Sequence, residues 1–366
     1  MIIKKIIAIL CICIMVCMSI SSGREDNSVN SASANEAHQM VLDMGAGINI
    51  GNSLDSCDWN TMFTVAEEPE KYETTWGNNE ISDQLIGMIA DKGFKTVRIP
   101  VTYMNHMSDD GNVDQKWLDR VQEVADLVLA HHMYCIIDIH HDTEDSGWIK
   151  ADQSNYDSNE EKVRKMVTII AERFKDYDSH LILEGFNEMV DMQGNWSKAP
   201  GNSYKIMNMW NQLFVDTVRA TGAGNGSRYL LVNLYAAAVD SKGIDQFVLP
   251  QDTCSDRILV GVHGYTTSDN MKKTFRLMKE LSDEGYAVVI GEYGIKLSAQ
   301  MTQADRMTYV QNYINYAKKL EVCPIWWDDG GNFEDVSEVN SYAIMDRQNN
   351  EWYFDDMADV IAMNGR

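Results

Sequence analysis

The 366-residue sequence has few basic residues, with 31 Lys and Arg against 55 Asp and Glu, and a formal net charge of -24. Nucleic-acid binding requires clustered Lys and Arg, and anionic membrane surfaces attract basic segments, so both kinds of partner are disfavoured. Proline is also scarce, at 5 residues, while 45% of the residues are hydrophobic. This composition excludes a disordered chain. The length permits two domains or one large barrel.

After the first 22 residues the sequence has no apolar run long enough to span a membrane. Residues 1–22 have the pattern of a secretory signal peptide, because Lys4 and Lys5 precede an apolar run from Ile6 to Met18 and small residues follow. This run is shorter than the roughly 20 residues that a bilayer requires. We expect a secreted, extracellular protein with no membrane attachment after cleavage; a retained anchor is the alternative. The Ser-, Asn- and Ala-rich residues 23–37 are expected to form a flexible linker.

The cysteines match no zinc-binding spacing and no disulfide scaffold. Seven are present, and three of them lie in the expected signal peptide. Cys57, Cys135, Cys254 and Cys323 are widely separated. Cys135 lies in an apolar, strand-like run and is predicted to be a buried thiol. A disulfide that involves Cys57 or Cys254 stays open.

From residue 44 onward, short apolar runs alternate with longer amphipathic segments. The strand candidates are 47–51, 96–100, 134–140, 181–187, 229–233, 258–263, 287–292 and 324–328. The clearest helical patterns are 114–131, 160–175, 204–221, 270–283 and 302–320. Eight such units in about 320 residues predict one (β/α)8 barrel, a TIM barrel with a single domain over residues 38–366. An open doubly wound sheet is the alternative, but the expected Gly-rich loop after its first strand is absent.

The apolar runs end in charged or reactive residues, at the positions where a barrel of this kind carries its catalytic groups. These residues are Arg98, His140, His141, Asn187, Glu188, His263, Tyr265, Glu292 and Asp328. Grouping charges costs desolvation energy, so their convergence on one barrel mouth indicates a functional site rather than stabilisation.

Glu188 and Glu292 follow the fourth and seventh predicted strands, and their side chains can approach each other across the mouth. Two facing carboxylates are what glycosidic bond cleavage requires: one protonates the leaving oxygen, and the other attacks the sugar carbon or activates water. A separation of about 5–5.5 Å is typical of retention and about 6.5–9.5 Å of inversion. The sequence does not choose between them. Arg98 is expected to hold one carboxylate ionised.

Metal-dependent and serine-dependent hydrolysis are disfavoured. His140 and His141 are adjacent, and neighbouring residues in a strand point to opposite faces, so we expect that they do not share one ion. No H-x-H, H-E-x-x-H or G-x-S-x-G motif occurs. We therefore expect no metal and no cofactor.

Taken together, these motifs resemble glycoside hydrolase family 5, the retaining endo-β-glucanases and their relatives. The matching segments are Gly47-Ile48-Asn49-Ile50-Gly51-Asn52, Arg98-Ile99-Pro100, His140, Asn187-Glu188, His263 with Tyr265, Gly291-Glu292-Tyr293-Gly294 and Trp327. Residues 54–55, 73–78 and 184–189 are most similar to subfamily 4, which contains cellulases, mixed-linkage glucanases, xyloglucanases and some xylanases. The resemblance implies that residues 38–366 form a catalytic (β/α)8 domain.

The resemblance also implies roles for individual residues. Glu188 matches the general acid/base, and Glu292 matches the nucleophile that forms a glycosyl-enzyme intermediate. Arg98 and Tyr265 correspond to the groups that hold Glu292, and Asn187 to the donor for the sugar 2-hydroxyl.

Further residues are expected to support the site or to bind substrate. His140 and His263 resemble the active-site histidines of the family, and Trp327 resembles the aromatic floor under the sugar at the cleavage point. His141 and Asn52 are expected to contact substrate. Gly264 departs from the family pattern, in which an aromatic residue often separates His263 from Tyr265.

Four tryptophans, Trp59, Trp76, Trp148 and Trp196, fall in predicted loops on the catalytic face. Their rings are expected to stack on glucose units, with anchoring of the loop as the alternative for each. We expect a monomeric endo-β-1,4-glucanase that acts on β-glucan. Xyloglucanase or mixed-linkage glucanase activity is the alternative, xylanase or mannanase activity is disfavoured, and a barrel that binds glycans without cleaving them is the reading from another class.

Overall fold

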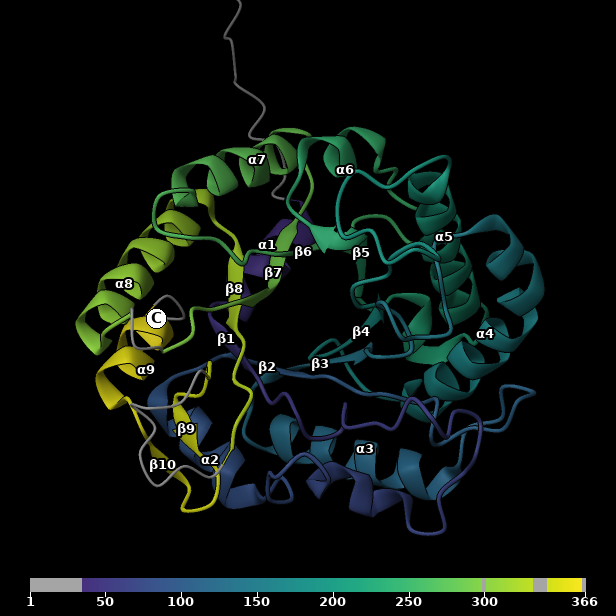
Figure 1. Cartoon of the computed structure of the whole chain (residues 1–366), viewed down its shortest axis with the longest axis horizontal. Helices are drawn as coiled ribbons and strands as arrows, with labels where there is room; N and C mark the ends of the chain where they lie inside the picture. Colours follow the sequence, from purple (N-terminus) through teal and green to yellow (C-terminus); the bar gives the residue numbers. More distant parts are fainter. Residues whose placement is uncertain (1–34, 298–300, 332–340, 364–366) are drawn as a thin grey trace, which may run out of the picture. The chain divides into compact units, whose positions relative to one another are not determined.

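The computed structural model describes residues 35–297, 301–331 and 341–363. Eight parallel strands form a closed barrel in chain order, and β1 pairs with β8 as well as with β2 (Figure 1). The strands are β1 (Gly47–Asn49), β2 (Thr96–Ile99), β3 (Tyr134–Ile139), β4 (Leu181–Phe186), β5 (Leu230–Ala238), β6 (Ile258–His263), β7 (Val288–Tyr293) and β8 (Cys323–Trp326). The predicted (β/α)8 fold is confirmed.

Helices surround the barrel on its outside (Figure 1). They are α2 (Asp83–Lys92), α3 (Gln115–Ala130), α4 (Gln153–Phe174), α5 (Ser203–Ala220), α6 (Ser241–Gln246), α7 (Met271–Asp283) and α8 (Gln303–Leu320), with 3-10 helices at Pro69–Thr74 and Ala223–Gly226. After the barrel, β9 (Met345–Asp346) and β10 (Glu351–Trp352) form an antiparallel pair, and α9 (Asp355–Ala362) packs beside α8.

The start of α4 lies seven residues before the predicted position, at Gln153 instead of residue 160. The side chain of Asp152 accepts hydrogen bonds from the backbone N–H groups of Ser154 and Asn155, which is an N-cap that starts the helix without any apolar residue. Tyr156 is the only aromatic or apolar residue in the first two turns, so hydrophobic periodicity does not reveal them.

An additional helix, α1 (Glu36–Met44), closes the barrel at the N-terminal ends of its strands. Its buried side chains, which include Met40 and Met44, cluster with inward-facing residues such as Ile136 and Leu259. The expected linker ended at residue 37, whereas Glu36 and Ala37 already belong to this helix. Residues 1–34, which include the expected signal peptide, lie outside the described residues. With this end closed, the opposite end of the barrel is left for a ligand.

The cysteine thiols that the structure describes are free. Cys57, Cys135 and Cys323 are buried and Cys254 is half-buried, so the buried thiol predicted at Cys135 is confirmed. The four cysteines form no disulfide with one another. Within the described ranges, no helix combines the length and the apolar character needed to cross a bilayer.

Candidate active site

Glu188 and Glu292 meet at the C-terminal mouth of the barrel, on either side of His263. One oxygen of each carboxylate and one ring nitrogen of His263 all lie within 4.8 Å of one another. Nδ1 of His263 is 2.6 Å from Oε1 of Glu188 and 3.5 Å from Oε2 of Glu292. The structure thus brings together the two carboxylates that the sequence predicts as a pair.

Irregularities in the strand pairing occur where the strands carry these groups. The register shifts between Val262 and His263 in β6, and between Ile290 and Tyr293 in β7. A similar shift brackets Asp138 in β3. Bulges of this kind rotate a strand locally and redirect its side chains, which explains how neighbouring strands present polar groups to a shared point.

Arg98 on β2 is fully buried, and acceptors surround its guanidinium group. NH1 donates to Oε1 of Glu292 at 2.9 Å, and NH2 donates to Oδ1 of Asn187 at 2.8 Å. Nε and NH2 bind the two oxygens of Glu184 at 2.7 and 2.9 Å, and NH2 also contacts Asp138 at 2.7 Å. A buried cation needs this compensation, and the arrangement fixes Glu292 and Asn187 relative to each other.

The sequence-based assignment missed three polar residues that hold this network. Asn49 on β1 accepts from NH1 of Arg98 at 3.0 Å. Asp138 accepts from Arg98 and is 2.7 Å from Nδ1 of His140, and Asn233 on β5 donates to Glu184 at 2.7 Å. The signal in the sequence is a polar residue inside an apolar strand run, which is costly unless the residue is paired.

Burial raises the pKa of both carboxyl groups of the pair. For Glu188 burial and then the charge of Glu144 raise the pKa to about 8, against the opposing effect of Arg98. For Glu292 burial raises the pKa to about 7, while His263, Arg98 and a hydrogen bond from Tyr265 oppose that effect. Glu292 therefore ionises first, and Glu188 keeps its proton to higher pH.

The expectation that His140 and His141 point apart is wrong. Their ring centroids are 4.6 Å apart, and potential ligand atoms of Asp55, His140 and His141 all lie within 4.8 Å of one another. Strand alternation does not apply because β3 ends at Ile139, before both histidines. We assign no metal site here, because Nε2 of His141 faces Oδ2 of Asp55 at 3.6 Å, and hydrogen bonds to Asp55 and Glu144 hold the pKa of His141 above its usual range, which favours the protonated ring that cannot bind a metal.

Most of the aromatic residues that were predicted to bind substrate are exposed or lie beside the histidines of the mouth, whereas one is buried. Trp59 is 41% exposed, and its ring lies 5.8 Å from that of Trp76, with His141 next to both. Trp196 is also 41% exposed, and Trp327 lies parallel to the ring of His140 at 5.6 Å. These rings are accessible or border the histidines of the mouth, which suits stacking on sugars.

The burial of Trp148 favours the alternative expectation, a ring that anchors its loop, over a substrate-binding ring. Trp148 is only 8% exposed, its indole N–H donates to Asp142 at 2.7 Å, and its ring packs edge-on against Phe63. Trp148 therefore anchors the β3–α4 loop.

Two remaining residues are placed close to the mouth. Asn52 lies in the β1–α2 loop, where its backbone N–H donates to Asp55; its contact with substrate stays a prediction. Gly264 is explained by packing, because a Cβ there would lie 1.9 Å from the hydroxyl oxygen of Tyr313. That hydroxyl donates to the carbonyl oxygen of Gly264 at 3.1 Å. The aromatic residue common in the family has no room at this position.

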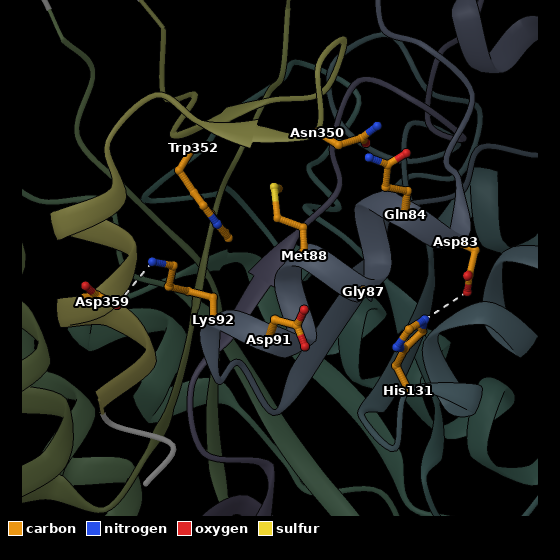
Figure 2. A pocket seen from close by; sticks show the side chains of 10 residues that line it. All are labelled: Asp83, Gln84, Gly87, Met88, Asp91, Lys92, His131, Asn350, Trp352 and Asp359. Atoms are coloured by element: carbon orange, nitrogen blue, oxygen red, sulfur yellow. Dashed lines mark hydrogen bonds and ion pairs between the residues drawn. The ribbon is translucent and has the colours of Figure 1, made fainter.

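A separate groove of about 610 Å³ lies among α2, the end of α3, β10 and α9 (Figure 2). Two pairs of its charged or titratable groups contact each other along the walls: Lys92 with Asp359 at 3.2 Å, and His131 with Asp83 at 2.8 Å. None of the predicted site residues lines this groove. We therefore locate the chemistry at the barrel mouth.

A parallel (β/α)8 barrel with two paired carboxylates at its mouth has the architecture of a glycoside hydrolase. The sequence model of the family described as cellulase, glycosyl hydrolase family 5, matches residues 60–332. The chain belongs to this family, and it is a glycoside hydrolase that is related to endoglucanases and acts on a glycan.

Relatives of known activity match over most of the chain. Endoglucanase A of Clostridium longisporum is 30% identical over 94% of this chain and 68% of its own length, and endoglucanase A of Ruminococcus albus is 31% identical over 90% and 93%. Among solved structures, a subfamily 4 broad-specificity endoglucanase from Ruminococcus champanellensis with bound cellotriose has a TM-score of 0.80 and 30% identity, over 89% of this chain and 98% of that one. A family 5 enzyme of Prevotella bryantii in complex with a xyloglucan tetradecasaccharide has a TM-score of 0.81 and 30% identity, over 90% and 98%.

Proposed function

We propose that this protein is a secreted, monomeric endo-β-1,4-glucanase that cleaves internal bonds of β-glucan by a retaining, metal-independent mechanism. The observation that carries the proposal is the short distance between the two carboxylates at the barrel mouth. One oxygen of Glu188 and one of Glu292 lie within 4.8 Å of each other. This upper limit favours the spacing of about 5–5.5 Å that is typical of retaining enzymes over the about 6.5–9.5 Å of inverting ones.

The surroundings of the two carboxylates support different roles for them. Glu292 receives hydrogen bonds on both oxygens, from Arg98 on Oε1 and from the hydroxyl of Tyr265 on Oε2. These donors stabilise the ionised form, which a nucleophile needs. Glu188 is next to His263 and keeps its proton to higher pH, which suits a general acid.

The reaction has two steps. In the first, an oxygen of Glu292 bonds to the anomeric carbon while the bond to the leaving oxygen breaks, and Glu188 transfers its proton to that oxygen. In the second, Glu188 as carboxylate takes a proton from water, and the water oxygen displaces Glu292 from the sugar. The second inversion restores the original anomeric configuration, and both carboxyl groups return to their starting protonation states.

The proposed substrate class is supported by the aromatic rings at the mouth. Trp59, Trp76 and Trp327 offer ring faces to the apolar faces of glucose units. The related enzymes from R. champanellensis and P. bryantii bind cellotriose and a xyloglucan oligosaccharide, respectively. The complex of the P. bryantii enzyme supports xyloglucan as an alternative substrate of this protein. Mixed-linkage glucan is the other alternative.

Secretion is proposed from residues 1–22 alone, because the positive start and the short apolar run are typical of a cleaved signal. Cell fractionation of the full-length chain, followed by N-terminal sequencing of the extracellular form, tests this part. Full-length protein retained in the membrane fraction would contradict it.

The activity is tested by product profiles on carboxymethylcellulose, barley glucan, xyloglucan, xylan and glucomannan side by side. We expect internal cleavage of the first two, and proton NMR of the first product should give the β-anomer. Preference for xyloglucan would support the alternative substrate. Binding to these polymers with no release of reducing sugar would overturn the enzymatic proposal in favour of a glycan-binding barrel.

A further inference from the structure

A third carboxylate, that of Glu144 in the β3–α4 loop, contacts Asn187, the residue that precedes Glu188. Its Oε1 accepts a hydrogen bond from Nδ2 of Asn187 at 3.0 Å and lies 3.1 Å from Nδ1 of His141. On the other side of the imidazole, Nε2 of His141 is 3.6 Å from Oδ2 of Asp55. The side chain of Glu144 is only 20% exposed, so it is part of the wall of the mouth and not of the outer surface.

The loop that carries Glu144 has an unusual conformation that places this residue. Glu144 has a φ of 65°, a left-handed backbone angle that non-glycine residues rarely adopt. Asp142 braces the loop by accepting the indole N–H of Trp148 and the backbone N–H of Tyr103, each at 2.7 Å. Nζ of Lys150 contacts the carbonyl oxygen of Glu144. Backbone strain that its surroundings maintain is typical of functional sites.

Glu144 completes the orientation of the Asn187 amide. The oxygen end of this amide accepts from NH2 of Arg98 at 2.8 Å, and the nitrogen end donates to Glu144 at 3.0 Å. An amide nitrogen has two hydrogens, so one N–H remains for a ligand. With both ends of the amide held, its remaining N–H has a fixed direction.

Glu144 also contributes charge. The pKa of His141 is held well above its usual range, because hydrogen bonds to Asp55 and Glu144 outweigh the effect of burial, and the pKa of both carboxyls is lowered. The protonated His141 lies between the ionised Asp55 and Glu144, so these three side chains together carry one net negative charge near Glu188. The groups that face Glu188 are Glu144, His141, Arg98, His263, Glu292, Tyr265 and Tyr342.

Building on the retaining mechanism proposed above, we propose that Glu144 is a positioning residue that orients the Asn187 amide and places a negative charge near the acid/base group. Its Oε1 fixes the Asn187 amide, and its negative charge favours the protonated form of Glu188. Burial is the largest cause of the raised pKa of Glu188, and Glu144 is the next. The strained loop is therefore part of the catalytic apparatus although Glu144 does not touch the reacting atoms.

Two substitutions separate contact from charge. Glu144→Gln keeps an oxygen that can accept from Asn187 and removes the charge, whereas Glu144→Asp keeps the charge and is one methylene too short for the contact. Asp145→Asn is the matched control, because Asp145 is an exposed acid one residue further along the loop and is not among the groups that act on Glu188.

The measurement is kcat/KM against pH for two aryl β-cellobiosides. The phenyl compound needs a proton on its leaving oxygen, and the 2,4-dinitrophenyl compound does not. For Glu144→Gln we expect the basic limb of the phenyl profile to move to lower pH, with a smaller loss on the dinitrophenyl compound. For Glu144→Asp we expect an unmoved limb and a loss of about tenfold on both compounds, the effect of one lost hydrogen bond to substrate.

Activity of the unsubstituted enzyme on both compounds tests the proposed function independently of the role of Glu144. An unmoved basic limb in Glu144→Gln, or an equal movement in Asp145→Asn, would overturn the electrostatic role. Full activity of Glu144→Asp would overturn the orienting role. Thermal unfolding of each variant checks folding, and if one of the two does not fold, the other still tests its own half of the proposal.

Discussion

The hydroxyl of Tyr265 donates a 2.9 Å hydrogen bond to Oε2 of Glu292, although Glu292 lies on β7 and Tyr265 lies in the β6–α7 loop and is 39% exposed. The other oxygen of the same carboxylate accepts from the buried Arg98. Each oxygen of Glu292 thus has its own donor: the partly exposed Tyr265 for Oε2 and the buried Arg98 for Oε1. The accessible donor can be removed without disturbing the barrel interior, which makes it the more informative one to change.

Tyr265→Phe should move the acidic limb of the pH–activity profile to higher pH. The Tyr265 hydrogen bond lowers the pKa of Glu292, so its loss raises that pKa, and the carboxylate that must be ionised is formed only at higher pH. On the acidic limb we expect kcat/KM to fall roughly 2- to 10-fold, the effect of one hydrogen bond. Tyr342→Phe is the control, since its ring is 5.5 Å from that of Tyr265. The same movement of the limb in both variants would contradict this assignment.

Glu188→Gln and Glu292→Gln should lose activity in different ways. Glu188→Gln removes the proton donor, and we expect a loss of about 10²- to 10⁴-fold on polysaccharide with a smaller loss on 2,4-dinitrophenyl β-cellobioside. Glu292→Gln removes the nucleophile and should abolish cleavage of both substrates. Reducing-sugar release and single-turnover kinetics provide the comparison. If Glu292→Gln retained activity on both, the nucleophile would have to be another residue.

Arg98→Met should destabilise the fold as well as the site, because Asp138, Glu184 and Glu292 would lose a shared buried cation. Removal of one partner from a buried ion pair costs about 3–5 kcal/mol. The uncompensated carboxyls would have a pKa above that of the unfolded chain, so the folded state would bind more protons and the defect would grow as pH rises. Denaturant unfolding at pH 5 and pH 8 measures this, with the exposed Arg276→Met as control. A defect that is equal at both pH values would argue against the electrostatic cause.

Exhaustive treatment with EDTA should leave the activity on carboxymethylcellulose unchanged. The reaction proposed for Glu188 and Glu292 uses only proton transfer and nucleophilic attack, which need no metal. The assay compares treated enzyme with and without added divalent cation. A loss of activity that a cation restores would mean that a metal contributes.

Much of the site could be predicted because the barrel imposes a simple rule: residues at the C-terminal ends of parallel strands meet. Arg98, Glu188, Glu292 and Tyr265 were found in this way, and the closed barrel brings Arg98 and Tyr265 within hydrogen-bond distance of Glu292. Each of the eight strands could be located as a short apolar run, because a strand that is buried on both faces consists mainly of apolar residues.

The contacts that depend on loop conformation could not be predicted. Glu144 reaches Asn187 only because of a left-handed backbone angle, for which a glutamate in a sequence gives no signal. His140 and His141 were assigned to opposite faces because the strand was expected to continue through residue 140. α1 was not predicted, because it is only nine residues long and its start falls in the segment that was expected to be a linker.

Trp59 and Trp148 are the same residue type in loops on the same face, and they should respond differently to truncation. Trp148 is buried with its N–H bonded to Asp142, so Trp148→Ala should cost about 3–5 kcal/mol of folding free energy and lower Tm. Trp59 is 41% exposed beside Trp76, so Trp59→Ala should leave Tm within a few degrees and raise KM for long β-glucans.

The comparison of Tm with KM for the two variants distinguishes a loop anchor from a sugar platform, because a structural defect and a lost stacking surface affect different measurements. Trp148→Phe is the intermediate case: it keeps the ring packing against Phe63 but loses the hydrogen bond to Asp142. It should recover most of the lost stability if packing dominates. If Trp148→Ala instead raised KM with no change in Tm, the ring would contact substrate after all, and the β3–α4 loop would have to open to expose it.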